Sequence, residues 1–117
     1  MQVRSFDEDI SHGDKKVKVS LILESSFSKE LRIVLRKGQV MNEHKAPFPI
    51  VVHILEGAID FGVHGSVHTL SRNSILTLDG NIPHDLVALE DSIVRLTLSK
   101  SDQLERVKQV ALQTPED

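Results

Sequence analysis

Histidine is the residue type through which this sequence could do chemistry. The chain has six histidines and no cysteine, which excludes disulfides, thiolate metal ligands and cysteine nucleophiles. A neutral imidazole can accept a hydrogen bond, act as a general base or bind a metal ion. His64 and His68 flank a predicted hairpin, where solvated side chains are common. The best candidates are therefore His44 and His84.

The segments around these two histidines have a defined spacing. Residues 38–57 read GQVMNEHKAPFPIVVHILEG, and residues 73–88 read NSILTLDGNIPHDLVA. The first segment resembles G-x5-H-x-H-x3-E-x6-G and the second resembles G-x5-P-x-G-x2-H-x3-N, the two sequence motifs of the cupin family. The chain thus resembles a small single-domain cupin. The resemblance implies an all-β double-sheet jelly-roll barrel, with His44 and His84 facing one another in an interior pocket.

The resemblance also raises the question of a metal. Cupins hold a divalent metal with two histidines and a glutamate of the first motif and the histidine of the second. The equivalent positions here are His44, Ala46, Ile50 and His84. Methyl and sec-butyl groups cannot donate to a cation, so only two ligands remain. We expect either no metal or a weakly bound divalent ion such as zinc, nickel, iron or manganese.

Other residues of the first motif are candidates for the pocket. Asn42 has the strand parity of His44 and is expected to face the same cavity, where its amide would hydrogen-bond a ligand. His53 has the opposite parity to Ile50 and is expected on the outer sheet face or in a subunit contact. The expected apolar wall consists of Ala46, Ile50, Val52 and Phe61. Apolar walls with a few convergent polar groups are typical of a small-molecule site.

Three arginines could form a second candidate site, one that binds an anion. Arg32 and Arg36 share one face of a predicted strand, and Arg95 belongs to a late strand. Pointing inward, a guanidinium would bind an anion in the barrel. Pointing outward, it would belong to a solvated face. The sequence does not decide between these orientations.

Short β-rich runs separated by turn residues must position these side chains. The predicted strands are 17–23, 31–35, 50–55, 59–63, 75–78 and 93–98, with a tight hairpin at His64-Gly65. After Leu98 the apolar period changes to that of a helix over 104–111. Asp102, with Glu105 three residues later, predicts its start, and Thr114-Pro115 predicts its end. The expected fold is all-β with a short C-terminal helix.

The composition bounds the organisation and the partners. With 117 residues, 39% of them hydrophobic, the chain predicts one domain over 1–117, with an ordered core of about 15–112 and loose ends that include His12. A net charge of −3 and only four aromatic residues, all Phe, argue against nucleic acid. No signal-like or membrane-spanning apolar run occurs, so we expect a cytoplasmic protein without a membrane partner. Apolar residues on alternating strand positions predict a homodimer.

Three functions stay open at this point. The first is a module that binds a small polar or anionic metabolite through His44 and His84. The second is an enzyme, either metal-dependent, of the dioxygenase or isomerase kind, or a metal-free epimerase-like one with histidine as general base. The third is a dimerisation or sensing unit. The two missing metal ligands favour the binding module.

Overall fold

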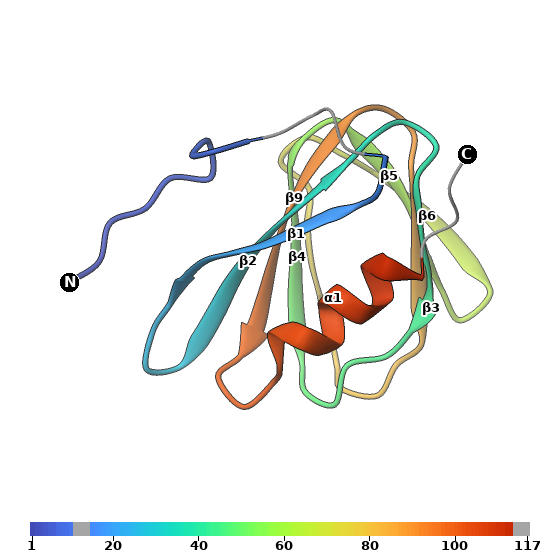
Figure 1. The fold of residues 1–117 in the computed structure, drawn as a ribbon. Helices are drawn as coiled ribbons and strands as arrows, with labels where there is room; N and C mark the ends of the chain where they lie inside the picture. Colours follow the sequence, from blue (N-terminus) through green and yellow to red (C-terminus); the bar gives the residue numbers. More distant parts are fainter. Residues whose placement is uncertain (11–14, 114–117) are drawn as a thin grey trace.

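The computed structural model describes residues 1–10 and 15–113 of the chain. Nine strands and one helix follow one another along these residues (Figure 1). They are β1 (Lys18–Glu24), β2 (Ser28–Leu35), β3 (Val40–His44), β4 (Ile50–Glu56), β5 (Ala58–Val63), β6 (Ser66–Ser71), β7 (Ile75–Leu78), β8 (His84–Ala88), β9 (Ser92–Ser99) and α1 (Leu104–Leu112). No helix of the described residues has the length and apolar character needed to cross a bilayer.

The strands form two antiparallel sheets. The five-stranded sheet has the order β1-β2-β9-β4-β7, and the four-stranded sheet has the order β3-β8-β5-β6. Strands far apart in the sequence pair with one another, as β2 with β9 and β3 with β8, which is typical of a double-sheet jelly roll. In Figure 1 the two sheets form the walls of a barrel, with α1 across one side. The predicted all-β fold with a C-terminal helix is confirmed.

The core forms because alternate residues of each strand point between the two sheets. In β4, Ile50, Val52 and Ile54 are at most 4% exposed, whereas His53 lies on the other face and is only partly buried. His53 thus has the expected outer orientation, although its Nδ1 is buried without a hydrogen-bond partner. From the opposite sheet, Ile59 and Phe61 of β5 pack into the same cluster. Both sheets therefore contribute walls to one interior.

The turns contain residues that tolerate a left-handed backbone. Asn73 and Asn81, where the family motif has glycine, have φ angles of 73° and 64°. The hairpin between β5 and β6 is the predicted two-residue turn, in which His64 and Gly65 have φ angles of 53° and 74°. Asparagine thus adopts a left-handed backbone at both positions of the second segment.

Helix α1 closes the side of the barrel between β1 and β3, the edge strands of the two sheets. Its buried residues are Val107, Val110 and Ala111. The helix starts one residue after the predicted start at Asp102: Gln103 is the N-cap residue, and its side chain makes no capping bond. Asp102 is instead almost fully buried and accepts hydrogen bonds from the Gln103 amide and from Arg106. The predicted stop at Thr114-Pro115 lies outside the described residues.

The N-terminal segment, residues 1–10, is mostly exposed and contacts the outer face of the five-stranded sheet at a few points. The guanidinium of Arg32, which is only 3% exposed, donates to the carbonyl oxygens of Phe6 and Glu8. Gln2 donates to the carbonyl of Glu24 at the end of β1. Buried polar groups need partners, and Nη1 of Arg32 finds two in this segment, whereas its Nε is buried without one. His12 lies outside the described residues.

Candidate functional site

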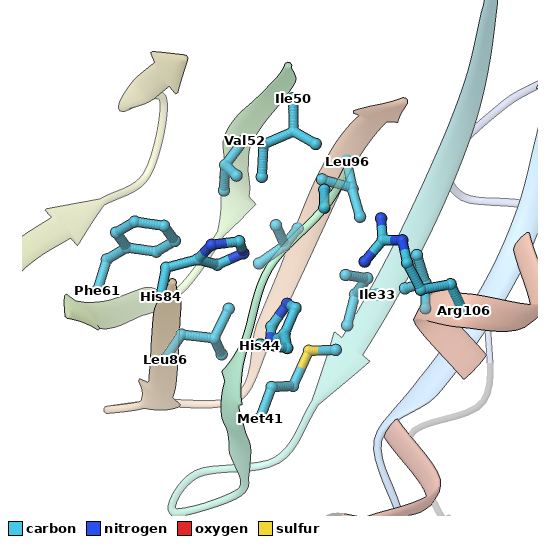
Figure 2. Close-up of a pocket in the computed structure, with 13 residues that line it drawn as sticks. Ile33, Met41, His44, Ile50, Val52, Phe61, His84, Leu86, Leu96 and Arg106 are labelled. Carbon is cyan, nitrogen blue, oxygen red and sulfur yellow. The ribbon is translucent and has the colours of Figure 1, made fainter. Parts of the chain in front are cut away.

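His44 and His84 meet inside the barrel. His44 ends β3, His84 begins β8, and the two residues are directly paired in the register of these strands. Their ring centroids are 4.3 Å apart with an interplanar angle of 63°. Phe61 from β5 stacks on the other side of His84, with centroids 5.4 Å apart. The pairing of β8 with both β3 and β5 therefore brings the three rings together (Figure 2).

A bulge in β3 decides which of its residues face the interior. Met41 pairs with Leu86 and His44 pairs with His84, so three steps along β3 match two steps along β8. Met41 and His44 consequently both line the cavity. The expectation that Asn42 faces the cavity is wrong, because the bulge turns this side chain outward. Asn42 is exposed and its amide donates to the carbonyl of Gln113.

The tautomer of each imidazole follows from its backbone contact. Nδ1 of His44 lies 2.7 Å from the carbonyl oxygen of Asn42, and Nδ1 of His84 lies 2.8 Å from that of Ile82. A carbonyl oxygen only accepts, so both Nδ1 atoms carry a proton and donate. In a neutral ring the proton-free nitrogen is then Nε2. Neither Nε2 has a hydrogen-bond partner among the described residues.

Burial keeps both rings neutral. The pKa of His44 is lowered to about 4, mainly by burial and to a smaller extent by the charges of His84 and Arg106, against the contact with the Asn42 carbonyl, which raises it. Burial, and less strongly the charge of Arg106, also lower the pKa of His84. At neutral pH the site thus offers two imidazole lone pairs rather than two positive charges.

Arg106 is the cation of this site, and it was not among the residues predicted from the sequence. It extends from α1 toward the cavity, on the side away from His84 and Phe61 (Figure 2). Its Nε and Nη2 donate to the buried carboxylate of Asp102 at 2.9 and 2.7 Å, an i,i+4 pair that spans the start of α1. The remaining guanidinium N–H groups have no partner among the described residues. The available signal was an arginine next to the apolar stripe of the helix, four residues after an aspartate.

The cavity between these groups is small and mainly apolar. Its volume is about 20 Å³, which is about enough for one water molecule. All four predicted wall residues line it, together with Met41 and side chains from both sheets and α1. The lining consists of Ile33, Met41, His44, Ala46, Ile50, Val52, Phe61, His84, Leu86, Val94, Leu96, Arg106 and Val107.

The arginines considered from the sequence lie elsewhere. Arg32 and Arg95 are on the outer face of the five-stranded sheet, where Arg95 donates to Glu30 and its guanidinium lies 5.9 Å from the ring centre of Phe6. Arg36 is exposed beyond the end of β2. None of the three lines the cavity. His64 and His68 are exposed, as expected of a hairpin.

The donors present do not fit a tightly held metal ion. Ala46 and Ile50 are 3% and 4% exposed and present only carbon to the cavity. The described residues contain no group of three or more histidine, cysteine or acidic side chains that could hold a metal. The guanidinium of Arg106 lowers the pKa of both histidines, and it repels a cation at the same place. Two imidazoles alone give an incomplete shell.

Comparison with solved structures identifies the fold. An RmlC-like cupin from Desulfovibrio desulfuricans matches with a TM-score of 0.74 and 23% identity, covering 86% of this chain and 97% of that one. A conserved protein with a double-stranded β-helix domain from Klebsiella pneumoniae matches with a TM-score of 0.75 and 18% identity, covering 88% and 94%. A cupin-2 domain protein from Shewanella frigidimarina matches with a TM-score of 0.71 and 14% identity, covering 83% and 94%.

No family model matches the sequence, and a search of curated proteins finds no match either. The structural likenesses therefore establish the fold: this chain has the jelly roll of the cupins, as the two motifs predicted. Because one fold supports many activities, the function has to be argued from the site.

Proposed function

We propose that this cupin-fold protein binds a small anionic metabolite in the interior cavity, with Arg106 holding the negative group. The observation that carries the proposal is a guanidinium fixed by a buried carboxylate, next to two neutral imidazoles, in an otherwise apolar cavity. Asp102 uses two of the five guanidinium donors and orients the rest. Charge-assisted hydrogen bonds of this kind are strong, and arginine is well suited to carboxylate and phosphate groups.

Binding requires the cavity to widen, since about 20 Å³ does not hold a metabolite. Helix α1 is the element that can supply the space, because it contributes Arg106 and Val107 to the lining and takes no part in either sheet. Outward movement of α1 breaks apolar contacts of Val107 and Val110 but no β-ladder. Elements that open to admit a ligand and then close over it are known in many binding proteins.

Binding fits the two imidazoles better than catalysis by them. A general base works best when its pKa is near the working pH, and burial lowers the pKa of His44 to about 4. A metal-assisted reaction lacks the third protein ligand and the carboxylate that such sites use. The lone pairs of His44 and His84 remain good hydrogen-bond acceptors at any pH above their pKa values.

Calorimetric titration with small carboxylates and with inorganic phosphate tests the proposal. Wild-type protein is expected to bind at least one of these anions, and Arg106→Gln is expected to weaken binding by about 10- to 100-fold, the value of one charge-assisted hydrogen bond. Arg95→Gln is the matched control, because Arg95 also pairs with a carboxylate but lies on the outer face. Equal loss in both variants, or no binding by the wild type, would contradict the proposal.

Because Arg106→Gln leaves Asp102 buried without its ion-pair partner, folding has to be controlled. The double variant Asp102→Asn, Arg106→Gln removes both charges together, and Arg106→Lys retains the positive charge without the planar fork. If the folded double variant still bound the anion, Arg106 could not be the group that holds it.

A further inference from the structure

The two imidazoles determine what else the ligand must carry. Each Nδ1 is engaged by a backbone carbonyl, at Asn42 and at Ile82, so each ring offers its Nε2 lone pair and no N–H. The rings share the cavity, with centroids 4.3 Å apart, and neither Nε2 has a protein donor among the described residues. A ligand that excludes water from such an acceptor without bonding it incurs a cost of about 1–3 kcal/mol. The ligand is therefore favoured if it brings a hydrogen-bond donor to this end of the cavity.

The lone pairs also exclude groups from this end. A carboxylate or phosphate oxygen placed against Nε2 would bring two acceptors together, so the anionic group belongs at Arg106 instead. Figure 2 shows Arg106 reaching in from α1 on one side and His84 lying on the other, with His44 between β3 and the cavity. The cavity therefore has one end that donates and one that accepts.

The donor has to be neutral. An ammonium group would be buried beside the guanidinium of Arg106, with no carboxylate free to compensate it. The oxygens of Asp102 already accept from Arg106 and from the Gln103 amide. The charge of Asp85 raises the pKa of both histidines, but Asp85 is exposed and lines a separate surface depression with Gly62, so its carboxylate does not face the cavity. A hydroxyl group meets the requirement, because it donates one proton and carries no net charge.

We infer that the site takes a short hydroxycarboxylic acid, whose carboxylate binds Arg106 and whose hydroxyl donates to Nε2 of His44 or His84. The inference rests on the proposed function and adds the class of ligand to it. The walls of Ile50, Val52 and Leu96 suit the short carbon chain of such an acid. A site built to bond a hydroxyl discriminates strongly against an analogue that lacks one, because its acceptors are then left unpaired.

Three matched pairs of small molecules test the inference by calorimetry at pH 7. Glycolate and lactate carry the hydroxyl, acetate and propionate lack it, and glycine and alanine replace it with an ammonium group. We expect the hydroxy acids to bind at least about 10-fold more tightly than the unsubstituted acids, the equivalent of one hydrogen bond to a buried acceptor. The amino acids are expected to bind most weakly.

The outcomes separate the inference from the proposed function. Equal binding of lactate and propionate, still weakened by Arg106→Gln, would overturn the hydroxyl inference and leave the anion site standing. Preference for alanine would overturn the argument for a neutral donor. Absence of binding by all six compounds would overturn both claims.

A variant locates the hydroxyl contact. His44→Leu removes one acceptor and is expected to reduce the preference for lactate over propionate, measured as the ratio of the two affinities, by about 5- to 10-fold. His68→Leu is the matched control, since His68 is exposed on β6. An unchanged preference in His44→Leu, with His84→Asn also unchanged, would overturn the assignment. The wild-type ratio of lactate to propionate does not depend on whether either variant folds.

Discussion

Acid should destabilise this protein through His44 before its carboxylates matter. In the folded chain, burial lowers the pKa of His44 to about 4, whereas the unfolded chain has the ordinary value of 6.5. Between these two pH values the unfolded state binds more protons than the native state, so the free energy of unfolding falls as the pH falls. The stabilising contribution is complete above pH 6.5 and is lost progressively toward pH 4.

The size of this effect follows from the two pKa values. A shift from 6.5 to about 4 corresponds to about 3 kcal/mol in full, of which about 2 kcal/mol is lost between pH 8 and pH 5. His84, with a pKa lowered for the same reason, adds to the fall. For a domain with a typical stability of about 5–15 kcal/mol, the change is large enough to measure.

Urea unfolding at half-unit steps from pH 8 to pH 5 measures the effect. His44→Gln, which cannot take up a proton, should give a profile flatter by about 2 kcal/mol over this range. His68→Gln, at an exposed position on β6, should keep the wild-type slope. Wild-type and His44→Gln profiles that run parallel would refute the burial of a neutral imidazole at this site.

Three further predictions concern metal, assembly and the N-terminal segment. Wild-type protein purified without a histidine tag should contain little metal and bind added zinc or nickel weakly, and one chelator-resistant metal ion per chain would contradict this expectation. The double variant Ala46→His, Ile50→Glu should raise the metal affinity by several orders of magnitude. Sedimentation equilibrium should show a dimer of the 13.1 kDa chain, and a monomer at micromolar concentration would count against it. The double variant Phe27→Ser, Ile75→Ser should weaken this dimer, since these side chains are 78% and 63% exposed beside one outer groove. Arg32→Met should lower the free energy of unfolding by about 1–3 kcal/mol, because the carbonyls of Phe6 and Glu8 lose a charged donor. The variant should also speed proteolysis within residues 1–10, and an unchanged cleavage rate would argue that Arg32 does not hold this segment.

Strands with regular apolar alternation were predictable, and those without it were not. Alternation predicted the inward residues Ile50 and Val52 of β4 and Phe61 of β5, but not the orientation of Arg32 on β2 or Arg95 on β9. It failed for β6, which is exposed along nearly its whole length and offers no apolar stripe. Strands β3 and β8 are five residues long, and β3 is also interrupted by its bulge. For β3 and β8, only the two motif segments indicated that the backbone has to position His44 and His84.

The candidate site was predictable where one strand register determines it. His44, His84 and the four wall residues follow from spacing within the two segments, and all six line the cavity. Asn42 was placed wrongly because a bulge adds one residue without a signal in the sequence. Arg106 was missed because its position depends on α1 closing the barrel between β1 and β3, a tertiary contact that helical periodicity does not contain.

A crystal structure of the protein with bound lactate tests the central claim most directly. We predict the lactate carboxylate within hydrogen-bond distance of the Arg106 guanidinium, its hydroxyl within hydrogen-bond distance of Nε2 of His44 or His84, and α1 displaced outward to make room. Lactate bound only outside the barrel, or a metal ion held between the two imidazoles in its place, would contradict the account.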